Sequence, residues 1–292
     1  MHRHTQMPAV VTTDPALELR SAVGRRAWHP DWLIPQWPVP GRVHAVFTTR
    51  QGGVSLPPFD SMNLGRPSDD DAQAVAANRA RLRDALGAEP NYLSQLHGIR
   101  SVELCAPVAA GALQADACTT AVAGLVCTIR VADCLPVLLA HAGAPVVGAA
   151  HAGWRGLAEG VLEANVAQFD ALVARSMGVP SSGNLSAQTL AWLGPCIGPT
   201  AFEVGSEVRA AFLAHDPTCG AMFTPGAPGK WFADLAGLAR MRLAAMGITR
   251  IYGNDSSPPW CTVRNASRFF SHRRDHIALG GSGRMAACIW FT

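Results

Sequence analysis

The fold is decided by residues 125–156, LVCTIRVADCLPVLLAHAGAPVVGAAHAGWRG. This stretch holds apolar, β-prone runs at residues 125–131, 137–140 and 145–150, which are typical of interior strands. The runs follow one another directly, with no segment between them long enough for a helix. Strands in direct succession favour a mixed-sheet α+β fold over a doubly wound parallel sheet.

The remaining elements surround this stretch. Further strands are predicted at residues 43–48, 190–193, 248–252 and 285–291, and helices at 69–86, 156–177, 207–214 and 235–246. Ser68 is expected to cap the first helix, and Gly87 and Gly178 are expected to end the first two. Residues 1–27 are predicted to be a mobile N-terminal arm and residues 28–292 a single domain.

Composition limits the class of protein. Of the 292 residues, 49% are hydrophobic and 15% charged, which indicates a large buried core. The net charge of +3 is mild, so we expect no nucleic-acid partner. Every long apolar run is interrupted by Gly, Pro or charge, so we expect no membrane span. Eight cysteines without a CxxC pair, and a start without an apolar signal region, favour the cytoplasm.

The first candidate chemistry is a metal site. His97, Cys134 and His151 each lie beside Gly, Asp or Pro at the end of an apolar run. Zinc accepts Cys and His together, and catalytic zinc sites use three protein ligands and leave a fourth position open. Such a metal activates water near neutral pH. Cys134 could instead be a nucleophile with His151 as its base, and the two roles compete for the same sulfur.

Copper is the alternative metal. One cysteine with two histidines also describes a blue-copper centre. A multicopper oxidase needs several closely spaced histidine pairs in addition. The only His-x-His in the chain is His2-Arg3-His4, in the predicted arm. The sequence therefore argues against a multicopper enzyme.

An anion site is the second candidate. Arg50 precedes a Gly-Gly pair after a predicted strand, and Arg155 follows His151 at a predicted helix start. Arginine forks and glycine backbone N–H groups both suit phosphate. Asp133, Glu203 and Asp234 stand at or near element ends, where a carboxylate is either a general base or a helix cap.

Seven short motifs together resemble one family. They are TTRQGGVS (48–55), NLG (63–65), QLHG (95–98), ADCLP (132–136), HAGWRG (151–156), GPCIG (194–198) and FFSHRRD (269–275). Their order and spacing are similar to those of the laccase-domain family, also called polyphenol-oxidase-like or YfiH-type. The resemblance runs from about residue 43 to the C-terminus.

The resemblance implies a metal, usually zinc and in some cases copper, held by residues matching His97, Cys134 and His151. It implies a layered α/β/β/α sandwich with mixed sheets and a duplicated unit, in a cytoplasmic protein with a nucleoside-sized pocket. We assign catalysis to Cys134, Asp133 and Glu203. Phosphate or substrate contacts are assigned to five residues from these motifs and the anion-site analysis: Arg50, Arg155, Asn63, Cys196 and Arg273.

The sequence departs from the family pattern near its C-terminus. The family usually has Tyr where this chain has His272. Residues 276–282 also lengthen the gap before Gly283-Arg284-Met285, which normally follows the Arg-Arg-Asp run closely. Both differences affect one edge of the expected pocket.

Three functions follow as hypotheses. The first is a metal-dependent enzyme of purine nucleosides, which phosphorolyses adenosine, inosine or methylthioadenosine and deaminates adenosine. The second is an amidase that edits peptidoglycan precursors by removing L-serine from UDP-MurNAc-serine. A copper-dependent polyphenol oxidase, or a non-enzymatic metal-binding protein whose Pro/Trp-rich segment docks a partner, ranks last. A monomer is favoured.

Overall fold

The computed structural model describes residues 28–180 and 185–292. The predicted arm, residues 1–27, with its His2-Arg3-His4 pair, lies outside the described residues. Within them, several strands follow one another directly and helices stand between other strands, as expected for an α+β protein. No helix of the described chain is long and apolar enough to cross a membrane.

The described residues form a four-stranded mixed sheet at one side of the molecule. Its strands, in spatial order, are β1 (Val43–Phe47), β13 (Met285–Phe291), β5 (Val126–Val131) and β2 (Pro90–Tyr92). β13 pairs antiparallel with both β1 and β5, whereas β2 runs parallel to β5. The C-terminal strand is thus central to this sheet, with the first strand beside it.

A six-stranded mixed sheet packs against the first. Its strands, in spatial order, are β12 (Arg250–Gly253), β8 (Thr189–Leu193), β6 (Leu135–His141), β7 (Val147–Ala152), β4 (Ala117–Thr120) and β3 (Ser101–Glu103). The antiparallel β6–β7 pair forms its centre and is buried along its whole length. The consecutive strands of residues 125–156 therefore span both sheets.

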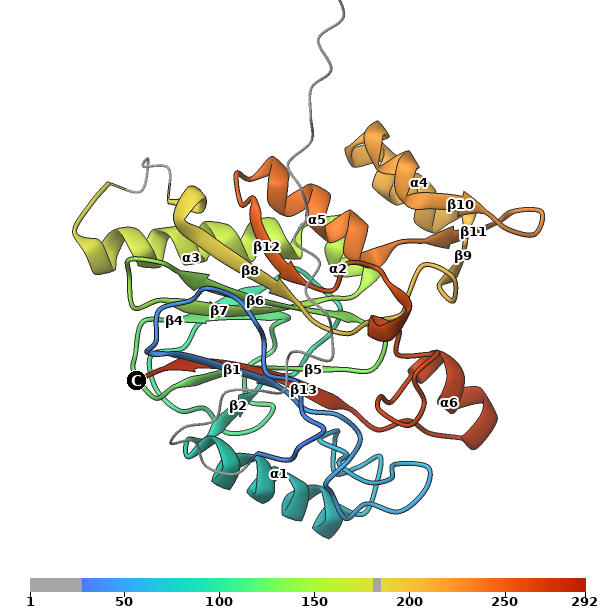
Figure 1. The fold of residues 1–292 in the computed structure, drawn as a ribbon, viewed down its shortest axis with the longest axis horizontal. Coiled ribbons are helices and arrows are strands. Elements are labelled where there is room, and N and C mark those ends of the chain that lie inside the picture. Colours follow the sequence, from blue (N-terminus) through green and yellow to red (C-terminus); the bar gives the residue numbers. More distant parts are fainter. Residues whose placement is uncertain (1–27, 181–184) are drawn as a thin grey trace, which may run out of the picture.

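Helices cover the outer faces of the two sheets (Figure 1). The helices are α1 (Ala72–Leu86), α2 (Trp154–Glu159), α3 (Val161–Met177), α4 (Ser206–His215), α5 (Leu235–Ala245) and α6 (His272–Leu279), and the short 3-10 turns are η2 (Ser186–Gln188), η3 (Pro217–Met222) and η4 (Pro258–Trp260). α1 lies outside the four-stranded sheet, whereas α3 and α5 lie outside the six-stranded one. A small sheet of β10 (Phe223–Pro225), β11 (Lys230–Ala233) and β9 (Glu203–Gly205) accompanies α4.

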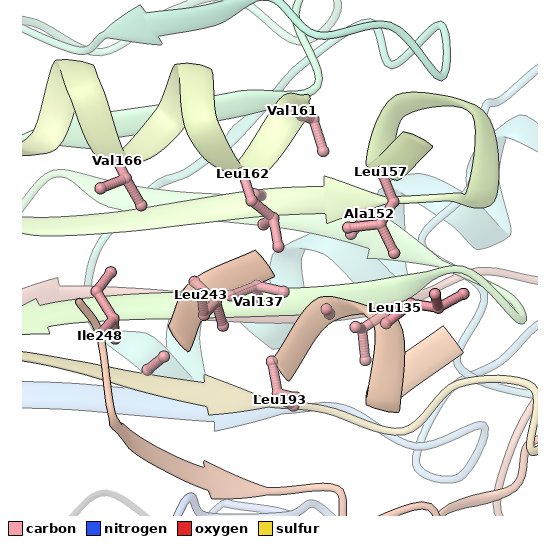
Figure 2. Packing of buried hydrophobic residues seen from close by; sticks show 14 of the residues in the cluster. Leu135, Val137, Ala152, Leu157, Val161, Leu162, Val166, Leu193, Leu243 and Ile248 are labelled. Carbon is pink, nitrogen blue, oxygen red and sulfur yellow. The ribbon is translucent and has the colours of Figure 1, made fainter. Parts of the chain in front are cut away.

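Buried apolar clusters in the described chain fill the spaces between these layers. Leu135, Val137 and Leu193 of the six-stranded sheet pack against Leu162 of α3 and Leu243 of α5 (Figure 2). A second cluster lies between the two sheets, and a third lies between the four-stranded sheet and α1. The order of layers is α/β/β/α, as predicted. The two sheets differ in strand number and order, and the duplicated unit stays a prediction.

The helix predicted at residues 156–177 is wrong as a single element. Gly160 adopts φ 110°, a conformation that L-residues with a side chain rarely accept, and it separates α2 from α3. The hydrophobic periodicity continues across the break, which is why the sequence pattern does not show it. The break leaves α2 as a separate short helix that begins at Trp154, just after β7.

Other boundaries also differ from the expectation. Asp71, not Ser68, caps α1, because its side chain accepts the N–H groups of Gln73 and Ala74. β7 extends two residues further than predicted, so His151 lies inside the strand. α6 and the short strands β2, β3, β4, β9, β10 and β11 carry too little periodicity to be predicted.

Candidate metal centre and its cavity

Different parts of the fold bring the predicted ligands together. His97 lies in the loop between β2 and β3 and adopts φ 63°. Cys134 lies in the turn from β5 to β6, where the chain passes from one sheet to the other. His151 lies on β7, opposite Pro136 of β6. Pairing of β6 with β7 therefore places Cys134 and His151 at the same end of the six-stranded sheet.

The geometry of these side chains fits a metal. One ligand atom from each of His97, Cys134 and His151 lies within 4.8 Å of the other two. Cys134 Sγ is 3.7 Å from His97 Nε2. Zinc bonds of 2.0–2.3 Å in a tetrahedron place S and N ligands about 3.6 Å apart. Among the described residues this is the one group of three His, Cys, Asp or Glu side chains close enough to hold a metal ion.

Asp116, at the start of β4, orients both histidines. Its Oδ1 is 2.9 Å from His151 Nδ1 and also accepts the backbone N–H of His97 at 2.9 Å. Its Oδ2 accepts the N–H groups of Leu96 and Gly98. A carboxylate on Nδ1 fixes the tautomer in which Nε2 is free to bind metal. The fold therefore supplies the outer support that histidine ligands need.

Electrostatics favour a thiolate at Cys134. Burial raises the pKa of the thiol, but the charge of His151 and hydrogen bonds from His151 and His97 lower it to about 6. Burial lowers the pKa of His151, whereas the Cys134 thiolate and Asp116 together raise it to about 9. A deprotonated thiol is the form that binds metal.

The three ligands open into a cavity of about 540 Å³, a size that suits a small-molecule ligand. Trp154 and Phe202 add aromatic surface to its lining. Arginines dominate its polar lining, at positions 66, 130, 155, 273 and 284, with carboxylates at Asp69 and Asp133. The described lining thus carries more positive than negative groups beside the ligands.

The structure places some of the predicted site residues at this cavity. Arg155 and Arg273 both line it, and the Arg155 guanidinium lies 4.5 Å from the ring centroid of Trp154. Asp133 lines it too, but Asp133 Oδ2 accepts hydrogen bonds from the Ser271 hydroxyl and the Arg273 N–H. Asp133 therefore holds the start of α6 against the cavity.

Other predicted residues lie outside the lining. Arg50 is buried; its guanidinium donates to the Asp60 and Ala266 carbonyls and pairs with the Asp60 carboxylate at 3.0 Å. Asn63 is buried behind the cavity, where its Oδ1 accepts the N–H groups of Gly65 and Arg284. Arg50 thus braces its own loop, and Asn63 acts on the cavity through its neighbours.

Glu203, Cys196 and Asp234 also lie away from the metal ligands. Glu203 is exposed on β9, and its backbone carbonyl accepts from Arg273. Cys196 is buried and its Sγ accepts from the Asn254 side chain. Asp234 caps α5 through the Gly237 N–H and accepts from the Ser256 hydroxyl. None of the three side chains is part of the described lining.

The lengthened gap at residues 276–282 has a simple structural form. The first four residues, 276–279, complete α6, and Gly280 ends the helix with φ 77°. His272 and Arg273 at the start of α6 still line the cavity, as does Arg284 after the gap. The extension thus lies beyond the cavity edge.

The family model described as multi-copper polyphenol oxidoreductase laccase matches residues 44–292. The chain belongs to this laccase family. Its members include a purine nucleoside phosphorylase of Pseudomonas aeruginosa, PA4543, which is 47% identical over 260 residues, 89% of this chain and 98% of that protein. The purine nucleoside phosphorylase YfiH of Escherichia coli is 45% identical over 88% of this chain and 98% of its own length.

Solved structures in the laccase family share the fold. Neisseria meningitidis protein NMB0706 superposes with a TM-score of 0.77 at 37% identity, over 89% of this chain and 99% of its own. YlmD from Geobacillus stearothermophilus superposes with a TM-score of 0.75 at 27% identity, over 94% and 99% of the two chains. The mixed α+β architecture is therefore that of the family.

The laccase family name includes copper, and the described ligand set is compatible with metal binding in general. Two imidazoles and one thiolate suit zinc and also suit copper. The described residues provide one such cluster and no second group of three metal-binding side chains. A multinuclear copper centre does not fit that set.

Several residues that shape the site were missed in the sequence. Asp116 stands immediately before the buried strand β4, and a carboxylate in that position was the signal that could have marked it as a site residue. Arg130 is the one charged residue in the apolar run of β5. Arg66 gave no comparable signal, because only the tertiary structure brings its loop to the cavity, and Arg284 entered the sequence analysis only within the segment Gly283-Arg284-Met285.

Proposed function

We propose that this protein is a purine nucleoside phosphorylase that splits adenosine, inosine or methylthioadenosine with phosphate. The observation that carries the proposal is the union of three metal-binding side chains, two aromatic rings and several arginines in one cavity. The names of the relatives from P. aeruginosa and E. coli support the same activity.

Different side chains of the cavity would contact the purine and the phosphate. Trp154 and Phe202 offer aromatic faces for stacking a purine. The arginines of the lining offer paired N–H donors to a phosphate dianion. A phosphate oxygen then forms a bond to ribose C1′, the C1′–N9 bond breaks, and the purine leaves with the electron pair and takes up a proton. The products are the free base and ribose 1-phosphate.

The metal ligands define where this chemistry takes place. A zinc ion, or a copper ion, bound by His97, Cys134 and His151 would supply a Lewis acid at the cavity floor. Asp116 holds the His151 imidazole through Nδ1 and the His97 backbone through its N–H. Asp133 holds Arg273 at the cavity through its hydrogen bond to the Arg273 N–H. Adenosine deamination, in which water replaces the 6-amino group and ammonia leaves, belongs to the same proposal.

A second candidate is the amidase that removes L-serine from UDP-MurNAc-serine. The number of arginines favours it, because a nucleotide-linked substrate carries a diphosphate and a carboxylate. In that case water would add to the amide carbonyl, the C–N bond would break, and serine would leave as the amine. The same cavity could hold either substrate.

The test is incubation of the purified, metal-replete protein with inosine, with and without phosphate. We expect hypoxanthine and ribose 1-phosphate to appear only when phosphate is present. Base release without phosphate, or no base release, contradicts the phosphorylase. Release of serine from UDP-MurNAc-serine, under conditions in which nucleosides stay intact, would favour the amidase.

A further inference from the structure

One wall of the cavity gathers positive charge from the four-stranded sheet. Arg130 lies on β5 and Arg284 directly precedes β13. Arg66 lies in a loop, two residues after Leu64. The register pairs Met285 with Val131, so Arg130 and Arg284 emerge close together at one end of the sheet. Arg155 and Arg273 reach the cavity from α2 and α6 instead. The two groups of arginines therefore approach the metal ligands from different layers.

The contacts of this wall hold the guanidiniums in place without neutralising them. Arg130 Nη2 donates to the Leu93 carbonyl at 2.8 Å, and Arg284 Nη1 donates to the Ser282 carbonyl at 2.7 Å. The Arg130 guanidinium lies 5.8 Å from the centroid of the Tyr92 ring, and the Arg79 guanidinium lies 4.5 Å from the centroid of the same ring. In the described chain no carboxylate forms an ion pair with Arg66, Arg130 or Arg284.

The positive charge of the wall is costly in the free protein. Burial and, to a smaller extent, the neighbouring arginines together lower the pKa of Arg130 to about 10. Burial lowers the pKa of Arg284 as well. Arg130 Nε is buried and has no hydrogen-bond partner in the described structure. Among the described residues, Arg130 and Arg284 are half-buried cations without an ion pair, and such groups are stabilised when an anion binds beside them.

We propose that Arg66, Arg130 and Arg284 form a subsite for a phosphoryl oxyanion, separate from the contacts made by Arg155 and Arg273. The inference deepens the proposed function and rests on it for the identity of the substrate. Inorganic phosphate and the diphosphate of a nucleotide share the chemistry that this wall recognises, namely a multiply charged tetrahedral oxyanion. Guanidinium forks bind such groups with two parallel hydrogen bonds.

The experiment is calorimetric titration of the zinc-loaded protein, with inorganic phosphate in one arm and uridine diphosphate in the other, at fixed ionic strength. The test variant is Arg66→Gln/Arg284→Gln, which leaves the Arg130 contact with Leu93 intact. Arg284→Lys keeps the charge but loses the fork. Arg42→Gln removes one positive charge at an exposed turn outside the cavity lining and is the matched control.

We expect at least one of the two anions to bind, and the double variant to bind it about tenfold more weakly or worse. Arg284→Lys should lie between wild type and the double variant, and Arg42→Gln should bind as wild type does. Equal affinity in wild type and the double variant overturns the subsite, as does failure of both anions to bind. Thermal unfolding of each variant verifies that the fold is retained.

The outcome for the subsite is distinguishable from the outcome for the proposed function. Arginine-dependent phosphate binding without base release from inosine supports the subsite and contradicts the phosphorylase. Arginine-dependent binding of uridine diphosphate alone supports the subsite and favours a nucleotide-linked substrate. Phosphorolysis that is unchanged in the double variant contradicts the subsite and leaves the phosphorylase standing.

Discussion

Asp116 Oδ1 lies 2.9 Å from His151 Nδ1, and the backbone carbonyl of Asp116 accepts the His151 N–H at 2.7 Å. The same carboxylate accepts the N–H of His97, which stands on a different loop. One buried side chain thus fixes the positions of two candidate metal ligands that are 54 residues apart in the sequence. Metal binding should depend on Asp116 although its carboxylate is not one of the three grouped candidate ligands.

The first prediction concerns Asp116→Asn. An amide has one acceptor oxygen, so it cannot serve the donors that now meet both carboxylate oxygens. We expect zinc affinity to fall by about 10–100-fold, measured by competition with a chelating dye. Asp170→Asn, at a half-buried carboxylate on α3 that accepts from Ser186, is the control and should keep wild-type affinity. Unchanged zinc affinity in Asp116→Asn would show that the carboxylate does not support the ligands.

The second prediction separates the two roles of Cys134. If Cys134 is a ligand, Cys134→Ala should lose both bound metal and nucleoside turnover, because two imidazoles alone hold zinc weakly. Elemental analysis and an activity assay on the same sample measure the two. Cys105→Ala, at an exposed cysteine, should keep both. Full metal content together with lost activity would instead identify Cys134 as a nucleophile.

The third prediction uses the close packing around Gly153. A Cβ added there would stand 2.9 Å from His97 Cδ2 and 3.1 Å from Cys134 Sγ. Gly153→Ala should therefore displace the ligands and weaken zinc binding, with a cost of about 1–3 kcal/mol shared between affinity and stability. Gly41→Ala is the control, because a Cβ there meets nothing within 4 Å. Zinc titration and thermal unfolding measure the cost, and equal behaviour of the two variants would rule out this contact.

The fourth prediction concerns acid stability and His141. This buried side chain is held neutral, since its Nδ1 accepts the N–H groups of Gly143 and Ala144. Burial lowers the pKa of His141 from its ordinary value of 6.5. As pH falls through 6.5 the unfolded chain therefore binds a proton that the folded chain excludes, and the free energy of unfolding decreases by up to about 1.4 kcal/mol per pH unit.

The matched variant for that prediction is His141→Asn, whose side-chain oxygen can accept the same N–H groups but does not titrate. Chemical denaturation between pH 7 and pH 5 should show a smaller loss of stability in His141→Asn than in wild type. His215→Asn, at an exposed histidine, should lose stability as wild type does. The same pH dependence in wild type and His141→Asn would exclude His141 as the cause.

Much of the fold could be predicted from local patterns. The apolar runs at residues 125–131 and 285–291 specified strands that are buried on both faces, and Gly87 marked the end of α1. Two patterns misled the prediction. Hydrophobic spacing continued through Gly160, which hid the break between α2 and α3, and Ser68 resembled a cap that Asp71 provides. In both cases the sequence correctly predicted a helix but placed one of its ends at the wrong residue.

At the candidate site, the sequence predicted some features and the tertiary structure decided others. By itself the sequence predicted the candidate ligands His97, Cys134 and His151, because a thiol and imidazoles are side chains that zinc accepts together. Only the tertiary structure decided which anionic and cationic groups surround them. Arg50 was expected at the substrate and is tied to Asp60, whereas Arg130 and Arg284 meet through the pairing of β5 with β13. Ligand type is a property of single residues, but the meeting of Arg130 with Arg284 depends on pairing between segments more than 100 residues apart.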